Sequence, residues 1–134
     1  MKHSNKTILF VDDDPDFRKM LTPWLRALGS TVVEATDGEE GLKRAKELMP
    51  DLIITNVKMP IMDGVTMTKM IKEDPKTKNI PVFLLTAFGD PGSEVYEKDV
   101  LTAQELGFTD YMVKAFPLEK IVERIKHLLA RSDA

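Results

Sequence analysis

Five strand-like segments alternate along this chain with segments that have the residue spacing of amphipathic helices. The expected strands are Thr7–Val11, Thr31–Ala35, Leu52–Thr55, Pro81–Thr86 and Tyr111–Val113. Thr7–Val11 shows no apolar–polar alternation, which is typical of a strand covered on both faces. Strands that alternate with helices form parallel sheets, and their right-handed crossovers place helices on both faces. The alternation therefore predicts an α/β fold of three layers around one five-stranded parallel sheet.

Five helices are expected to connect and follow these strands. The first begins at Asp14-Pro15, an N-cap followed by a first-turn proline, and stops at Gly29. Pro23 lies inside it and should bend one helix rather than divide it into two. The other helices are expected from Asp37 to about Met49, from Asp63-Gly64 to Asp74-Pro75, up to Leu106-Gly107, and from Leu118 to Leu129. We expect one domain over residues 1–134, with a core from about 7 to 129.

The composition excludes several classes of function. The chain has no cysteine, so it has no disulfide framework, thiol nucleophile or thiolate zinc site. Its net charge of −3 gives no overall electrostatic footprint for nucleic acid, so we expect no direct nucleic-acid contact. No apolar run approaches the ~20 residues that span a bilayer, and the first six residues lack the apolar core of a secretory signal. We therefore expect no membrane contact and a cytoplasmic location.

Polar side chains lie where four of the expected strands end. Asp12 and Asp13 follow the first strand, Asn56 follows the third, Thr86 closes the fourth and Lys114 follows the fifth. Open α/β sheets bind their ligands at the carboxyl ends of the strands. Adjacent carboxylates repel each other unless a cation joins them, and oxygen-only sites suit Mg²⁺ or Mn²⁺. Phosphoryl transfer requires such a cation together with cationic and hydrogen-bond-donating groups on the departing oxygens.

Four motifs close these strands in a fixed order. They are Val11-Asp12-Asp13-Asp14-Pro15, the stretch Asp51–Gly64, Leu84-Leu85-Thr86-Ala87 and Tyr111-Met112-Val113-Lys114. In this order they resemble the receiver domain of bacterial two-component response regulators, and the resemblance extends from about Thr7 to about Leu129. It implies a flavodoxin-like, doubly wound sheet with the strand order 2-1-3-4-5.

The resemblance also assigns a metal pocket. Asp12 and Asp13 match the acidic residues that hold Mg²⁺ or Mn²⁺, with Asp13 as the direct ligand and Asp12 acting largely through water. The main-chain carbonyl of Lys58 would be a further ligand. Asn56 matches the phosphate-accepting aspartate, which is the last protein ligand of the cation.

Asn56 is the largest departure from the family pattern. A carboxylate can attack phosphorus, whereas an amide has a delocalised nitrogen lone pair and an uncharged oxygen and is not a useful nucleophile. We therefore expect no phosphorylation at Asn56, no part for this chain in its own phosphoryl transfer, and no enzyme activity. The substitution also removes one anionic ligand, so we expect weakened Mg²⁺ binding. Two histories fit Asn56: a natural receiver that works without phosphate, or an aspartate replaced on purpose.

Two further departures concern the second half of the chain. The family usually has proline after the lysine, joined by a cis peptide, but Ala115 follows Lys114 here. A cis bond before alanine costs ~2.5–4 kcal/mol, so the bond is either strained for function or trans with Lys114 placed differently. The stretch from Thr86 to Lys114 is also longer than is common in the family, with the extra residues around Gly89–Asp99. Loops often carry specificity, so that region is a candidate recognition feature.

The resemblance implies a switch and a set of partners. Thr86 and Lys114 match the residues that contact the phosphoryl group, and Thr86 with Tyr111 matches the switch pair. In receivers the hydroxyl moves towards the phosphate and the ring rotates inward, which reshapes the face of the fourth helix, fifth strand and fifth helix. A sensor histidine kinase or phosphotransfer protein and a downstream protein on this face are the expected partners, and a weak homodimer is compatible with them. Without phosphate, we expect the inactive arrangement to dominate unless a partner supplies the difference.

Four other interpretations compete with this one. If Asn56 is natural, the chain could be a phosphate-independent pseudo-receiver that only binds partners. A haloacid dehalogenase-like phosphohydrolase would use Asp12 as nucleophile and Asp14 as general acid, but the cap insertion and late acidic pair of that family are missing. A flavodoxin-type cofactor binder needs anion-binding donors in its first loop, which is acidic here. A purely structural role, in which Asp12 to Asp14 cap a helix, explains Asp14 and leaves the other two without a function.

Overall fold

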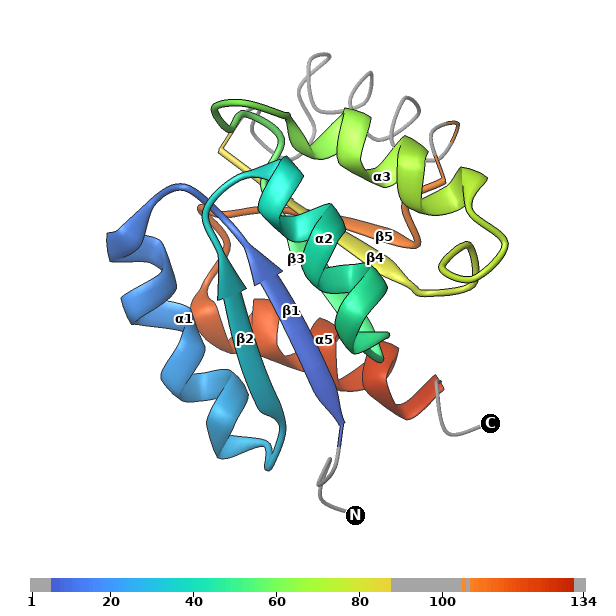
Figure 1. The fold of residues 1–134 in the computed structure, drawn as a ribbon. Helices are drawn as coiled ribbons and strands as arrows, with labels where there is room; N and C mark the ends of the chain where they lie inside the picture. The colour runs from blue at the N-terminus through green and yellow to red at the C-terminus, as the bar shows by residue number, and fades with distance from the viewer. Residues whose placement is uncertain (1–5, 88–104, 106, 132–134) are drawn as a thin grey trace.

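The computed structural model describes residues 6–87, 105 and 107–131, and it contains one five-stranded parallel sheet (Figure 1). The strands are β1 (Thr7–Val11), β2 (Thr31–Ala35), β3 (Leu52–Thr55), β4 (Val82–Thr86) and β5 (Asp110–Val113). Their order is β2-β1-β3-β4-β5, and every neighbouring pair is parallel. The predicted flavodoxin-like topology is confirmed. β4 begins at Val82 and not at Pro81, since proline has no N–H for the ladder.

Four helices lie in the part of the chain that the structure describes. They are α1 (Pro15–Ala27), α2 (Gly38–Leu48), α3 (Gly64–Glu73) and α5 (Leu118–Arg131). The predicted N-caps Asp14 and Asp37 are confirmed, because their side chains accept backbone N–H groups of the first turns. Asp63, predicted only as part of a turn, caps α3 in the same way. Pro23 lies inside one continuous α1, as predicted. The Gly89–Asp99 region and all of the predicted fourth helix except its last residues lie outside the described residues.

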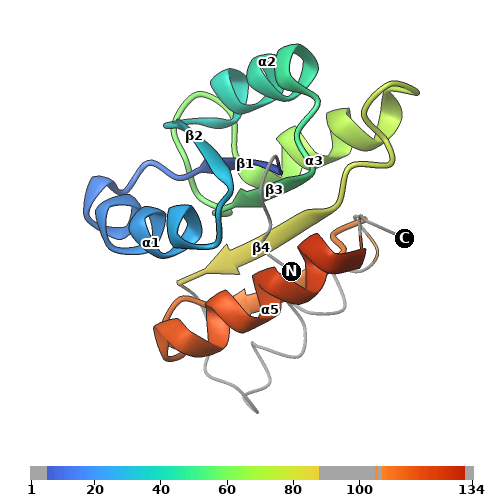
Figure 2. The same ribbon diagram turned by 90° about the horizontal axis from the view of Figure 1, so that it is seen from below.

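The helices cover the two faces of the sheet in pairs (Figure 2). α1 and α5 pack on one face, where Leu21 and Ile125 belong to the same buried cluster as Phe10 and Phe83. α2 and α3 pack on the other face through a second cluster that includes Ala45, Met67, Leu9 and Leu84. Side chains of one strand alternate between the two clusters, so the sheet is buried on both sides. No helix among the described residues is long and apolar enough to span a membrane.

Candidate functional site at the carboxyl edge of the sheet

The ladder register brings the predicted site residues to one edge of the sheet. Val11 pairs with Thr55, and the backbone N–H of Asn56 donates to the carbonyl of Val11 at 3.1 Å. The acidic loop after β1 and the loop after β3 therefore begin side by side. On the other side of β3, the N–H of Lys114 donates to the carbonyl of Thr86 at 2.8 Å. All the strand-end residues that sequence patterns singled out thus share one edge.

Asp12 is the buried anion of this edge. Its carboxylate is fully buried, and its Oδ2 atom lies 2.7 Å from Lys114 Nζ. Burial raises the pKa of the Asp12 carboxyl above its ordinary value, and the hydrogen bond and charge of Lys114 oppose that rise. The other oxygen of Asp12 accepts the N–H of Asp14 at 3.0 Å. The predicted neighbours Asp12 and Lys114 are therefore a close ion pair.

Two α1 residues that the sequence patterns did not assign to the site also contact this pair. The Nζ atom of Lys114 lies 4.4 Å from the centroid of the Phe17 ring, in cation–π geometry. Arg18 donates from a terminal guanidinium nitrogen to the Asp12 carbonyl at 2.6 Å and from Nε to Glu34 at 2.8 Å. The spacing assigned Phe17 only to the buried stripe of α1. The only sequence feature that could have indicated their contact with the site is their position in the first helical turn after the acidic cluster.

The contacts of the Asn56 side chain distinguish this site from a metal pocket with free ligands. Its Nδ2 atom donates to Asp13 Oδ1 at 3.4 Å and to the main-chain carbonyl of Lys58 at 3.1 Å. These acceptors are the two other groups predicted to bind the cation directly. The amide nitrogen faces both of them, so the residues as arranged do not fit a divalent cation unless the Asn56 amide turns over. No cluster of three or more His, Cys, Asp or Glu side chains suited to a metal occurs in the described ranges.

The loop from Asn56 to α3 is held by its backbone. The N–H of Gly64 donates to the Val57 carbonyl at 2.8 Å, and the hydroxyl of Thr55 donates to the carbonyl of Asn56 at 2.9 Å. A Cβ atom at Gly64 would overlap that same carbonyl oxygen of Asn56. The Asp63-Gly64 pair therefore has two functions, since Asp63 caps α3 and Gly64 lets the helix start against the site.

Lys114, Thr86 and Tyr111 are the other predicted site residues. The described residues contain no cis peptide, so the Lys114–Ala115 bond is trans, and Lys114 still reaches Asp12. Thr86 is buried at the end of β4. Tyr111 is 8% exposed and lies in the α2/α3-side cluster with Leu84, so its ring is packed inside and not turned out to solvent.

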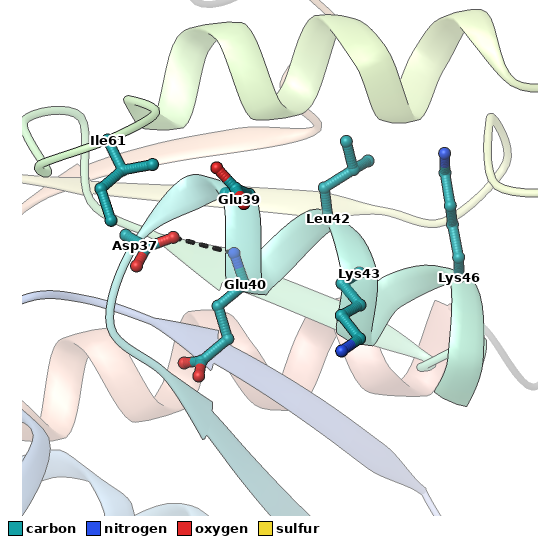
Figure 3. A pocket seen from close by; sticks show the side chains of 7 residues that line it. All are labelled: Asp37, Glu39, Glu40, Leu42, Lys43, Lys46 and Ile61. Atoms are coloured by element: carbon teal, nitrogen blue, oxygen red, sulfur yellow. Dashed lines mark hydrogen bonds between the residues drawn. The ribbon is translucent and has the colours of Figure 1, made fainter.

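A separate hollow of about 570 Å³ lies beside the site loop (Figure 3). It is lined by Asp37, Glu39, Glu40, Leu42, Lys43, Lys46 and Ile61, which include none of the predicted site residues. Ile61 is 76% exposed and has a φ of 70°, between Pro60 and Met62, whose N–H donates back to the Pro60 carbonyl at 2.7 Å. This is a strained three-residue turn with a β-branched residue at its centre.

Comparison with known proteins decides the family. The family model for the response regulator receiver domain matches residues 8–126. The chain belongs to this family. Receiver domains as a family bind Mg²⁺ at the acidic edge and contribute catalytically to their own phosphorylation, although they are not generally enzymes. The acidic edge of this receiver contains Asp12 and Asp13, and the amide of Asn56 lies beside Asp13.

Two curated transcriptional regulators are similar to this receiver. RpaA of Synechocystis, a DNA-binding dual master transcriptional regulator, is 35% identical over 126 residues, which cover 94% of this chain and 50% of RpaA. PhoP of Bacillus subtilis, the alkaline phosphatase synthesis transcriptional regulatory protein, is 36% identical over 129 residues, which cover 96% of this chain and 50% of PhoP. The chain therefore spans about half the length of these relatives.

Solved receivers have the same fold. The chemotaxis response regulator CheY4 of Vibrio cholerae matches with a TM-score of 0.80 at 28% identity, covering 92% of this chain and 98% of CheY4. The signal receiver domain of a histidine kinase from Syntrophus aciditrophicus matches with a TM-score of 0.80 at 32% identity, covering 93% and 90% of the two chains. The family match over residues 8–126 replaces the haloacid dehalogenase and flavodoxin interpretations, since the fold alone would not exclude a flavodoxin. Asp14, the general acid of the former, instead accepts the N–H groups of Asp16 and Phe17 as an N-cap.

Proposed function

We propose that this receiver takes no phosphoryl group at residue 56 and signals through binding of its switch face to a protein partner. The observation that supports this most is the amide of Asn56, which stands at the acceptor position and donates to Asp13 and to the Lys58 carbonyl. An acceptor must direct an anionic oxygen at phosphorus, and this side chain has none. The receiver is therefore a binding module and not an enzyme.

We propose that the side chains around Asn56 supply the other groups of a phosphoryl-transfer site. Asp13 is exposed at the edge, Thr86 ends β4 with a hydroxyl, and Lys114 supplies a cation next to Asp12. Hydroxyl and ammonium groups held in this way stabilise the oxygens of a transferring phosphoryl group. We infer that the site lacks only its nucleophile. The same lack weakens Mg²⁺ binding, because one of the anionic ligands is replaced by a neutral amide.

The proposed partners are those of a response regulator. A sensor histidine kinase or phosphotransfer protein would dock at the acidic edge, and a downstream protein would dock on the face that includes β5 and α5. The buried ring of Tyr111 favours a second candidate, a pseudo-receiver whose docking face is set without phosphate. In both cases the structural unit that we propose is the core from about residue 7 to 129.

Phosphorylation by a small phosphodonor tests the proposal. The unaltered chain and an Asn56→Asp variant would be incubated with Mg²⁺ and the donor, and intact masses would be recorded. We expect a phosphoryl group on the variant alone. If neither chain is labelled, the rest of the pocket is degenerate and the pseudo-receiver function is favoured. If the unaltered chain is labelled, another residue is the acceptor and the proposed mechanism is wrong.

A further inference from the structure

Two loops present hydrogen-bond acceptors to each other at the acidic edge. The loop after β1 contributes the carboxylate of Asp13, and the loop after β3 contributes the main-chain carbonyl of Lys58. Neither acceptor can donate a proton to the other, so a direct link between these two groups requires a positively polarised group between them. A divalent cation is one such group, and an N–H₂ group is another.

The Asn56 amide has the valence for this position. Its nitrogen has two N–H bonds, and it has two acceptors, at 3.4 Å on Asp13 and at 3.1 Å on Lys58. If the amide oxygen lay there instead, it would face two other oxygens with no proton between them. The backbone of Asn56 is held in place, because its N–H is hydrogen-bonded to β1 and its main-chain carbonyl is packed against Gly64. The position of the side-chain amide is therefore restricted.

The second carboxylate of the pocket is already compensated. Lys114 Nζ lies 2.7 Å from Asp12 and over the ring of Phe17. A cation that entered would find one carboxylate paired with an ammonium group and the other accepting an amide N–H. The charge of Asp12 is therefore paired with Lys114, and Asp13 accepts an amide N–H, without an added ion.

We propose that the Asn56 amide takes the place of the divalent cation in this receiver. It joins the β1–α1 loop to the β3–α3 loop, so that the folded domain needs no Mg²⁺, and a cation binds only if the amide turns over. The inference rests on the proposed function, because it concerns the same pocket, and it adds a metal-independent structural role for the substituted residue.

Thermal unfolding with and without Mg²⁺ tests this role in four chains: the unaltered protein, Asn56→Asp, Asn56→Ala, and Asn79→Ala as an exposed control. The unaltered chain and the control should have equal Tm values in chelator and in Mg²⁺. Asn56→Asp places a third carboxylate beside Asp12 and Asp13, so its Tm should fall in chelator and rise by about 5–10 °C when Mg²⁺ exceeds its Kd by ten- to a hundredfold. Asn56→Ala should have a lower Tm than the control in both buffers, because the bridge is lost.

Three results overturn the inference. The first is a Tm of the unaltered chain that rises with Mg²⁺ as much as the Tm of Asn56→Asp does. The second is a Tm of Asn56→Asp that does not change with Mg²⁺. The third is a Tm of Asn56→Ala equal to that of the control. If Asn56→Asp does not fold, the side-chain NH₂ resonances of Asn56 in ¹⁵N-labelled unaltered protein replace it, and a shift on addition of Mg²⁺ contradicts the inference. Phosphorylation of the unaltered chain would instead overturn the proposed function, whatever the Tm values.

Discussion

Replacement of Lys114 by methionine isolates the ion pair at the centre of the site. Methionine keeps an unbranched stem against Phe17 and removes the charge that lies 2.7 Å from Asp12. Asp12 is fully buried, and the side chain of Lys114 is 14% exposed. Breaking a buried pair costs ~3–5 kcal/mol, and we expect about 3 because water can reach the lysine end. With an unfolding entropy of ~2.1 cal/mol/K per residue, this loss lowers the Tm by ~10 °C.

The sign of the pH dependence follows from Asp12. Burial raises the pKa of this carboxyl, so the folded state takes up a proton at higher pH than the unfolded state does. Its contribution to the free energy of unfolding is therefore full below the ordinary pKa and is lost as the pH rises through the folded pKa. Without Lys114, which opposes the rise, the folded pKa moves further up. The stability deficit of Lys114→Met should be largest at neutral pH and shrink in acid.

Urea unfolding at pH 7 and at about pH 4.5, for the single variants and for the double variant with Asp12→Asn, measures this effect. Comparison at each pH cancels the other titrating groups. In the Asp12→Asn background, loss of Lys114 should cost less than ~1 kcal/mol, because no buried charge remains. A cost that is the same in both backgrounds, or independent of pH, would show that Lys114 stabilises the domain without pairing with the Asp12 carboxylate.

Three other perturbations have defined outcomes. Gly64→Ala should unfold the domain or cost more than ~3 kcal/mol, since its Cβ would overlap the Asn56 carbonyl; circular dichroism against temperature measures this. Ile61→Asn should stabilise by ~0.5–1 kcal/mol, because asparagine tolerates the positive φ better, and a fall in Tm would mean that the isoleucine has contacts worth more than its strain. Lys72→Met should lower the free energy of unfolding by ~1–2 kcal/mol in urea, since Lys72 Nζ donates to two carbonyls of the 78–80 segment. An unchanged urea midpoint would show that these hydrogen bonds do not stabilise the segment.

Strand positions and helix caps could be predicted from local sequence patterns, whereas the strand order could not. Strand positions followed from local pattern, because β3 and β4 are buried on both faces and contain only residues that suit such strands. Strand order is set by long-range pairing, such as Val11 with Thr55, which no local pattern encodes, and it came from the family resemblance. Caps were predictable, since Asp14 and Asp37 accept N–H groups only two or three residues away.

The site was predictable as a set of residues but not as a set of contacts. The positions of Asp12, Asn56 and Lys114 follow from the ends of parallel strands. Lys114 pairs with Asp12 and at the same time lies over the ring of Phe17. These two contacts depend on the directions of side chains from three different segments, which the sequence does not give. The direction of the Asn56 amide is likewise a product of two loops that meet only in the folded state. The trans bond at Lys114–Ala115 resolves the alternative that the sequence left open.

The phosphoryl content of Asn56→Asp, compared with the same variant carrying Asp13→Asn, is the measurement to make first. Asp13 is exposed, so its replacement leaves the fold intact while removing the predicted direct metal ligand. If the pocket is a receiver site that lacks only its nucleophile, the single variant gains one phosphoryl group and the double variant gains far less. Equal labelling of the two, or labelling of the chain with Asn56 unaltered, would contradict that conclusion.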